Sequence, residues 1–410
     1  MNEEALRFVR CQFPALNGEW IFLDNAGGSQ TAKQVGERIT QYLYQSNVQL
    51  GASYDVSVRA GERVTQSQKT MAEFVNARDE KEIILGPSTT QLLQNLSKSL
   101  LQLFKPGDEV IVTNCDHEAN IGPWMNMMKS GIVVKTWKIN PETFSLDLSS
   151  LKKLMTPRTK LVAFTHVSNV VGTINPVKEI TSFVHERGAM VCVDGVAFAP
   201  HRQVDVRDWD VDFYAFSFYK VYGPHYSLLY AKRDILGKLT GINHYFIGRQ
   251  DIPYKLQPGN VNFELTYGLL GVTDYFDAVY DFLHPGSKKG LRNRLDELYK
   301  LFSENEAYLA SLLIDFLKSK KEVKIIGEKS ADPGIRVPTI SFIKTGNKSS
   351  EIPPVTDAHQ IGIRYGDFYA RRLIESLGLA ETDGVVRISL VHYNTGDEIN
   401  KLIHILDRVL

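Results

Sequence analysis

Residues 210–230 read DVDFYAFSFYKVYGPHYSLLY, and the fold class follows from this stretch more than from any other. Apolar and aromatic residues lead up to Ser217, and a second apolar run follows Ser227. Runs of this length are typical of strands buried inside a sheet. Gly223 and Pro224 lie between the two apolar runs, and this pair of residues indicates a turn. The stretch therefore predicts a strand, a lysine at position 220, a turn and a second strand.

Lys220 lies between Tyr219 and Tyr222 in this apolar setting. Burial of an unpaired ammonium is costly and lowers the pKa of a lysine. A neutral amine beside an aldehyde forms a Schiff base, which is how proteins hold pyridoxal phosphate. Alternatively, the lysine extends its charged end to water over an aromatic surface. The stretch alone leaves both interpretations open.

The composition is that of a globular protein with no preferred charge. The 410 residues are 43% hydrophobic, and 47 basic residues balance 47 acidic ones, so we expect no nucleic acid and no membrane among the partners. The chain begins with charges of both signs and has no long apolar run, which predicts neither a signal peptide nor a membrane span. Three widely spaced cysteines without a metal-ligand pattern favour the reducing cytoplasm.

Short apolar runs alternate with helical patterns over the first part of the chain. The expected strands are 83–85, 110–112, 133–134, 161–164 and 189–193, and the expected helices include 59–76 and 176–187. Such alternation predicts an α/β domain, in which helices cover both faces of a mostly parallel sheet.

A second, smaller set of elements follows residue 230. Helical patterns cover 264–282 and 288–318, strands are expected at 323–326, 339–342, 361–364 and 385–390, and helices at 365–377 and 397–410. Pro285 and Gly286 mark a boundary between the two sets. We therefore predict a large domain over 17–284 and a small α+β domain made of 1–16, a short helix, and 285–410.

Polar side chains follow the expected strands where each strand ends. The residues are His117, Ser168, Asn169, Asp194 and Ser217. Ligands of parallel sheets bind beyond the carboxyl ends of the strands, so we expect these side chains to share one crevice. Ser88, Thr89 and Thr90 open a helix directly after the strand at 83–85. They are suited to bind a phosphate at a helix N-terminus or, more simply, to cap the helix.

These residues match the needs of a pyridoxal phosphate site. Lys220 would bind the aldehyde, Asp194 would keep the pyridine nitrogen protonated, and His117 would lie over the ring. Asn169 would bond the ring hydroxyl, while Ser88, Thr89, Thr90 and Ser217 would hold the phosphate. Each residue has a simpler explanation, such as a capping role for Asp194. Their coincidence at several strand ends favours a single site, and no metal site is expected.

Four longer motifs resemble the class V aminotransferase family, and in particular its cysteine-desulfurase-like branch. They are 168–176 (SNVVGTINP), Asp194-Gly195 with 199–206, Ser217 to Lys220 with Gly223-Pro224, and Arg387-Ile388-Ser389 with Tyr393-Asn394-Thr395. The resemblance spans nearly the whole chain. It implies the fold of type I pyridoxal-phosphate enzymes, with a seven-stranded sheet in the large domain, and a homodimer.

The resemblance also implies roles for individual residues. Lys220 would be the cofactor lysine, and Arg387 would bind the substrate carboxylate, a task suited to a bidentate guanidinium. The turn at Asn260 would reach the phosphate of the neighbouring subunit, so the site would be shared across the dimer. Tyr54 and Arg364 would border the substrate, together with Asp367 and Tyr369.

The sequence also departs from the desulfurase pattern. Tyr369 replaces the cysteine that accepts sulfur, and a tyrosine cannot act as a thiolate at neutral pH. Tyr219 stands where a histidine is usual, Ala197 where a glutamine is usual, and Asn260 where a threonine is usual. Cys115 lies close to His117 in sequence but is more simply a buried residue.

The sequence therefore predicts a pyridoxal-phosphate enzyme that acts on an L-amino acid. C–S cleavage, a related β-elimination, or epimerisation would require no acceptor thiol. Two alternatives remain at this point: an aminotransferase that uses the same residues, and a protein that binds the cofactor without turnover.

Overall fold

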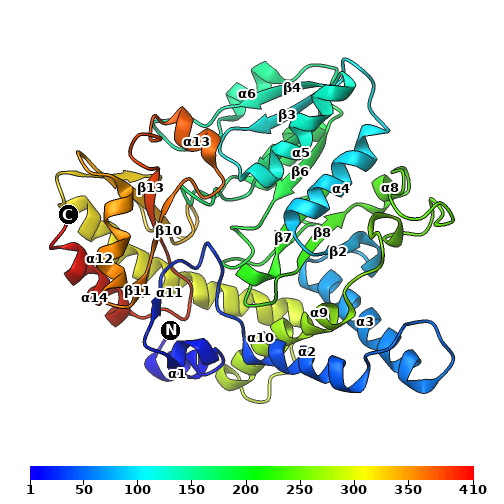
Figure 1. Cartoon of the computed structure of the whole chain (residues 1–410), viewed down its shortest axis with the longest axis horizontal. Helices are drawn as coiled ribbons and strands as arrows, with labels where there is room; N and C mark the ends of the chain where they lie inside the picture. The colour runs from blue at the N-terminus through cyan, green and yellow to red at the C-terminus, as the bar shows by residue number, and fades with distance from the viewer.

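The computed structural model describes residues 1–410 and has at its centre the expected seven-stranded sheet (Figure 1). In spatial order its strands are β2 (Ile83–Gly86), β8 (Ser227–Ala231), β7 (Phe213–Ser217), β6 (Met190–Asp194), β5 (Thr159–Thr165), β3 (Glu109–Thr113) and β4 (Val133–Trp137). Only β8 runs antiparallel to its neighbours. The predicted α/β class and the mostly parallel, seven-stranded sheet are confirmed.

Both faces of this sheet are buried. On β7, Phe213 and Ala215 belong to one apolar cluster, whereas Tyr214 and Phe216 belong to another. Successive side chains of a strand point to opposite faces, so each strand contributes to both clusters. Complete burial of a large apolar side chain contributes about 1.5–3 kcal/mol, which explains the near-continuous apolar runs in the sequence.

Helices form the layers on the two faces. Those before the small domain are α1 (Glu3–Arg10), α2 (Lys33–Gln45), α3 (Asp55–Phe74), α4 (Thr89–Leu101), α5 (Gly122–Met125), α6 (Leu148–Leu154), α7 (Val177–His185), α8 (Arg233–Leu236), α9 (Phe263–Gly268) and α10 (Leu270–Leu283). Leu92, Leu96 and Leu100 of α4 pack on one face, and Val177, Ile180 and Val184 of α7 on the other. None of the helices has the length and apolar character needed to cross a membrane.

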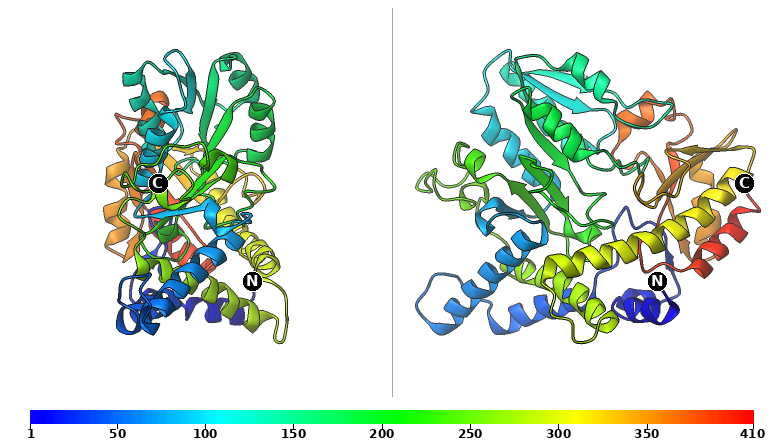
Figure 2. Two further views of the ribbon diagram at one scale, coloured as in Figure 1. Left: turned by 90° about the vertical axis from the view of Figure 1, so that its right-hand side faces the viewer. Right: turned by 180° about the vertical axis from the view of Figure 1, so that it is seen from behind.

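The small domain has a four-stranded antiparallel sheet. Its order is β12 (Arg364–Gly366), β13 (Val385–Ser389), β10 (Thr339–Lys344) and β9 (Val323–Ile326), and its helices are α12 (Pro353–Asp357), α13 (Arg371–Ser376) and α14 (Gly396–Leu406). The long helix α11 (Leu291–Ser319) extends from the large domain to this sheet (Figure 2). Leu298 and Phe302 pack in the large core, and Leu313 and Leu317 in the small one.

Two expected elements of the small domain were wrong in detail. The single strand expected at 361–364 is divided between β11 (Ile361–Gly362) and β12, which lie in different sheets. The helix expected at 365–377 is only α13, because Gly366, Phe368 and Tyr369 have positive φ values that end regular structure. The N-terminal strand β1 (Ile21–Phe22) pairs with β11 and so brings the residues after it to the small domain.

Candidate active site

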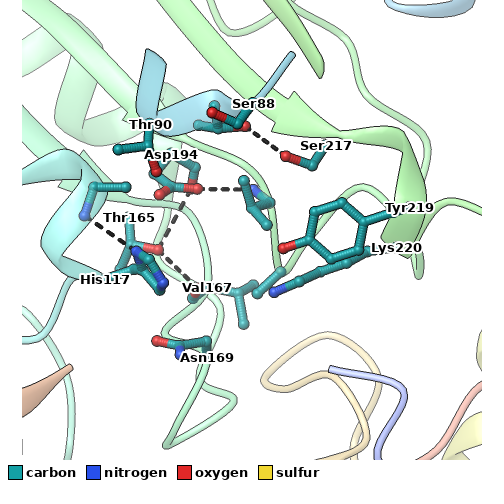
Figure 3. Close-up of a pocket in the computed structure, with 14 residues that line it drawn as sticks. Ser88, Thr90, His117, Thr165, Val167, Asn169, Asp194, Ser217, Tyr219 and Lys220 are labelled. Carbon is teal, nitrogen blue, oxygen red and sulfur yellow. Dashed lines mark hydrogen bonds between the residues drawn. The ribbon is translucent and has the colours of Figure 1, made fainter. Parts of the chain in front are cut away.

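A pocket opens at the carboxyl ends of the parallel strands, where the sequence predicted a crevice (Figure 3). Its lining residues are Ser88, Thr89, Thr90, His117, Ala119, Thr165, Val167, Asn169, Asp194, Val196, Ala197, Ser217, Tyr219 and Lys220. Most of the predicted cofactor residues are therefore brought together from segments far apart in the chain. Lys220 and Tyr219 lie across the pocket from His117 (Figure 3).

Lys220 follows β7 at the end of a 3₁₀ turn, Phe218–Lys220, and is 6% exposed. It forms no ion pair, so its charge has no direct partner. Burial, and then the nearby cation of Arg387, lower the pKa of Lys220 to about 8, although Asp194 acts in the opposite direction. A substantial share of this amine is therefore neutral and nucleophilic slightly above neutral pH.

Hydroxyl groups at the start of α4 form one side of the pocket. Ser88 caps α4 by accepting a hydrogen bond from the backbone N–H of Gln91, at 3.1 Å. Beside it, hydroxyl groups form a chain in which Ser217 Oγ lies 2.8 Å from Thr89 Oγ1 and 2.7 Å from Ser227 Oγ. Free amides and the positive end of the helix dipole attract phosphate at such a position. Both interpretations of this helix start, capping and anion binding, are compatible with the geometry.

Asp194 ends β6 and is 4% exposed. Its Oδ1 accepts a hydrogen bond from the backbone N–H of Val196 at 2.9 Å, and no protein donor contacts Oδ2. Burial raises the pKa of Asp194 to about 6. A carboxylate with one free oxygen in a desolvated pocket is well suited to a protonated ring nitrogen, since such a partner offsets the cost of burial.

His117 presents a neutral ring. Burial, and then the charges of Lys220 and Arg387, lower the pKa of His117 to about 4. Its Nδ1 accepts a hydrogen bond from the backbone N–H of Ala119 at 3.1 Å, which leaves the proton on Nε2 and fixes the ring. A flat, uncharged ring in a fixed orientation can stack on an aromatic cofactor.

The preceding residue, Asp116, anchors the His117 segment to the sheet. Its carboxylate accepts hydrogen bonds from the backbone N–H of Thr165 at 3.0 Å and from Asn120 Nδ2 at 2.7 Å. Burial raises the pKa of Asp116 to about 8. The hydroxyl group of Thr113 donates a further hydrogen bond to the carboxylate of Asp116. Asp116 therefore connects the ends of β3 and β5 behind the pocket.

Asn169 carries an unsatisfied buried atom. Its Nδ2 donates to the carbonyl of Phe368 at 2.8 Å, whereas its Oδ1 has no hydrogen-bond partner in the protein. Native structures seldom leave such an atom unpaired without a functional reason. A hydroxyl group of a ligand in the pocket would satisfy it.

Arg387 lies behind Asn169 and is 2% exposed. Its Nη2 contacts Asp24 Oδ1 at 2.8 Å, its Nη1 donates to the carbonyl of Asn169 at 3.1 Å, and its Nε is buried without a partner. Arg364 contacts the other oxygen of Asp24 at 3.5 Å. The two arginines predicted to bind substrate therefore share one carboxylate, which the sequence analysis did not anticipate.

The segment 366–370 covers this region from the small domain. Phe368 and Tyr369 have φ values of +53° and +59°, which non-glycine residues seldom adopt. The ring of Phe368 lies 3.8 Å from the guanidinium of Arg387, and the ring of Tyr369 lies 5.3 Å from that of His117. The backbone N–H of Glu118 donates to the carbonyl of Tyr369 at 2.7 Å. Strained residues held by such contacts are common at functional sites.

Several predicted residues do not line the pocket of this chain. They are Ser168, Arg364, Asp367, Tyr369 and Arg387, together with Tyr54 and Asn260. Tyr54, half exposed, precedes α3, and Asn260 lies in an exposed turn with a φ of +101°. Asn260 was expected to act on the site of a neighbouring subunit, which remains a prediction.

No reactive thiol is close to these groups. Cys115 and Cys192 are both buried, and burial raises the pKa of each thiol above its ordinary value. A thiol acts as a nucleophile only as the thiolate, so neither cysteine is prepared for that role. The third cysteine, Cys11, lies at the end of α1.

The pocket residues fit pyridoxal phosphate. The fit rests on the unpaired Oδ1 of Asn169, the free oxygen of Asp194 and the unpaired amine of Lys220, three polar groups that the protein itself leaves without partners. Each is matched by a group of the cofactor: its hydroxyl, its ring nitrogen and its aldehyde. The hydroxyl chain at α4 would meet the phosphate.

Comparison with known proteins gives a consistent result. Residues 21–284 and 295–402 match the family described as Aminotransferase class-V. The chain is 42% identical over 418 aligned positions to "Aminotransferase-like protein FGM3" of Gibberella zeae, with 99% of this chain and 98% of that protein covered. It is 34% identical to "Cysteine desulfurase-like protein ustD" of Aspergillus flavus, with 98% and 90% covered.

A solved structure shares the fold. The apo structure of cysteine desulfurase from Thermococcus onnurineus NA1 superposes with a TM-score of 0.85, and the alignment covers 98% of this chain and 97% of that one. The two sequences are 24% identical, so this likeness concerns the fold alone.

Proposed function

Because the chain belongs to the aminotransferase class-V family, we propose that it is a pyridoxal-phosphate-dependent enzyme that acts on an L-amino acid without forming a protein persulfide. The reactions that suit it best are C–S or related β-elimination, and epimerisation. What supports this choice is that Tyr369 stands where the desulfurase-like pattern would place the sulfur-accepting cysteine, and that Cys115 and Cys192 are buried.

The residues that would hold the cofactor are those that line the pocket. Lys220 would bind the aldehyde, Asp194 the ring nitrogen and Asn169 the ring hydroxyl. Ser88, Thr89, Thr90 and Ser217 would hold the phosphate, and His117 would cover one face of the ring. When bound, pyridoxal phosphate withdraws electrons from the α-carbon of an amino acid and so weakens the bonds to that carbon.

The remaining chemistry falls to side chains of the protein. Arg387 would bind the α-carboxylate through its Nε edge, with Asp24 and the carbonyl of Asn169 holding the guanidinium in place. Lys220, whose amine is partly neutral near pH 8, would take the α-proton once the substrate amino group has replaced it. Segment 366–370 would cover one side of the bound substrate through Phe368, and Arg364 would contact the rest of the substrate.

Two alternatives remain within the same site. An aminotransferase is favoured by the similarity to the aminotransferase-like protein of Gibberella zeae and requires no additional residue. A protein that binds the cofactor without turnover is suggested by Ala197 and Asn260, which replace polar residues of the family pattern. Lys220, Asp194 and Arg387 are all present, which weighs against this second alternative.

We further propose a homodimer in which the site is shared. The turn at Gly259 and Asn260 has positive φ values at both residues and lies exposed outside the pocket. A partner subunit would bring this turn to the phosphate. Size-exclusion chromatography with light scattering tests the dimer. The balanced charge of the chain and its free cysteines support a cytoplasmic protein that recognises small molecules.

The function is tested with purified, cofactor-loaded protein and a panel of S-substituted cysteines. Release of pyruvate without any added keto acid supports elimination, and turnover that depends on an added keto acid supports transamination. Exchange of the α-proton without a keto product supports epimerisation. Lys220→Ala is the control, since activity that survives this change contradicts the catalytic role of the lysine.

A further inference from the structure

Tyr219 lines the pocket, but the proposed function assigns no role to it. Its ring is stacked on that of His225, with centroids 4.9 Å apart and planes inclined by 8°. On another side the ring packs against Gly28, so closely that a Cβ atom on this glycine would lie 3.4 Å from Cδ2 of Tyr219. The backbone carbonyl of Tyr219 accepts a hydrogen bond from the backbone N–H of Ser29 at 3.1 Å. The side chain is therefore held firmly in one orientation.

The hydroxyl group of Tyr219 points into the pocket, beside the amine of Lys220 (Figure 3). No protein atom forms a hydrogen bond with it, although the other large buried tyrosines nearby, such as Tyr222 and Tyr226, use their hydroxyl groups in bonds to the protein. A fixed phenol with an unpaired O–H at the mouth of a cavity is positioned to serve a bound molecule.

The surroundings of Tyr219 keep its phenol protonated. Burial, and then the carboxylate of Asp194, raise the pKa of Tyr219, so the phenol carries its proton at neutral pH. The cation of Arg387 acts in the opposite direction and would stabilise a phenolate formed during a reaction. The Nζ of Lys220 lies 5.8 Å from the centre of the phenol ring, a separation that one water molecule could bridge.

From this geometry we infer that Tyr219 is a catalytic acid, which protonates the group that leaves the β-carbon of the substrate. The inference rests on the proposed β-elimination. The proton on the α-carbon passes to Lys220, and the electron pair of that C–H bond forms a double bond to the β-carbon. The bond from the β-carbon to the leaving sulfur breaks, and the sulfur takes both electrons and then the proton of Tyr219. Lys220 returns its proton to the phenolate, so the two side chains are restored. The products are a thiol and an enamine that water converts into pyruvate and ammonia.

This role complements the absence of a thiol in the site. In a persulfide mechanism the sulfur is taken by a cysteine, and Tyr369 cannot do so. A sulfur that instead departs to solvent is a strong base as an alkylthiolate, so a proton at that moment lowers the barrier. Two of the departures of this chain from the desulfurase pattern, those at positions 219 and 369, then have one common explanation.

The leaving group provides the test. The cofactor-loaded wild-type protein and Tyr219→Phe are compared on S-methyl-L-cysteine, whose thiolate needs a proton, and on β-chloro-L-alanine, whose chloride does not. We expect kcat of the variant to fall by about 10²–10⁴-fold on the first substrate, the range typical of a lost general acid, and to change less than about threefold on the second. The matched control, Tyr365→Phe, changes a partly exposed tyrosine outside the pocket and should match the wild type on both.

Affinity for the cofactor is measured in parallel by titrating cofactor-free protein with pyridoxal phosphate. An unchanged Kd in Tyr219→Phe supports the proton-donor role. A raised Kd with unchanged kcat at saturating cofactor shows that the phenol only binds the cofactor, and equal losses on both substrates show a structural role; either result overturns the inference. A wild-type protein that processes neither substrate overturns the proposed elimination and, with it, this role of Tyr219.

Discussion

Replacement of Lys220 by methionine should stabilise the cofactor-free protein at neutral pH. Lys220 is buried without an ion-pair partner, and burial lowers its pKa from the ordinary 10.5 to about 8. Below pH 8 the folded protein therefore holds an unpaired ammonium, at a cost to stability. The difference in pKa corresponds to roughly 3 kcal/mol, at 1.36 kcal/mol per pKa unit. We expect a gain of about 2–3 kcal/mol in the free energy of unfolding, because Asp194 loses a nearby cation in the variant.

The gain should depend on pH in a defined direction. The unfolded chain binds more protons than the folded one between pH 8 and 10.5, so the wild type becomes more stable relative to the variant over that interval. Urea unfolding of both proteins at pH 7 and pH 10 measures this change. Lys255→Met is the matched control: Lys255 is also buried, but its Nζ donates to the carbonyls of Leu236, Leu239 and Arg249, so its removal should destabilise the protein. A Lys220→Met variant that is less stable than the wild type at pH 7 would refute the reasoning.

Three further changes test the groups around Lys220. Arg387→Lys keeps the positive charge but loses the planar guanidinium group that can form two parallel hydrogen bonds. In steady-state kinetics KM should therefore rise roughly ten- to hundredfold, as expected for one lost charge-assisted hydrogen bond. The control, Arg371→Lys on the exposed face of α13, should leave KM unchanged. Asp194→Asn removes the carboxylate that, in the proposed function, would face the ring nitrogen. We expect kcat to fall by roughly 10²-fold or more with cofactor still bound, and full activity would contradict this role. Asp24→Asn leaves the buried Arg387 without a counter-charge. It should lower the free energy of unfolding by about 2–3 kcal/mol in urea titrations, less than for a fully buried pair because Asp24 is 24% exposed.

Much of the large domain could be predicted because its signals are local. Each parallel strand is a short apolar run followed by a polar residue, and parallel strands of one sheet end at the same edge. His117, Asn169, Asp194 and Ser217 could therefore be expected in one pocket before any contact was known, and the structure brings them together.

The contacts between distant segments could not be predicted in this way. Asp24 reaches Arg387 because the two-residue strand β1 pairs with β11, more than three hundred residues later in the chain, and so short a strand has no recognisable pattern. The strained backbone at Phe368 and Tyr369 was hidden for a different reason. Positive φ values are usually signalled by glycine, and here two aromatic residues adopt them because tertiary contacts fix their carbonyls.

Asp116 and Tyr219 were missed although both are visible in the sequence. Asp116 precedes His117, and its buried carboxylate connects two strand ends, a contact that its position in the sequence does not reveal. In the sequence Tyr219 is recognisable as the neighbour of Lys220 and as a substitution for histidine, but nothing there indicates which way its hydroxyl group points. A phenol adjacent to the predicted cofactor lysine was the one signal that could have identified it.

The most direct test of the account is the chemical identity of the residue that binds the cofactor. Purified protein is incubated with pyridoxal phosphate, reduced with borohydride, digested and analysed by mass spectrometry. The account predicts that the mass of the reduced cofactor is found on the peptide that contains Lys220, and that Lys220→Ala yields no labelled peptide. Label on another lysine, or none in the wild type, would contradict the assignment of this pocket as a pyridoxal phosphate site.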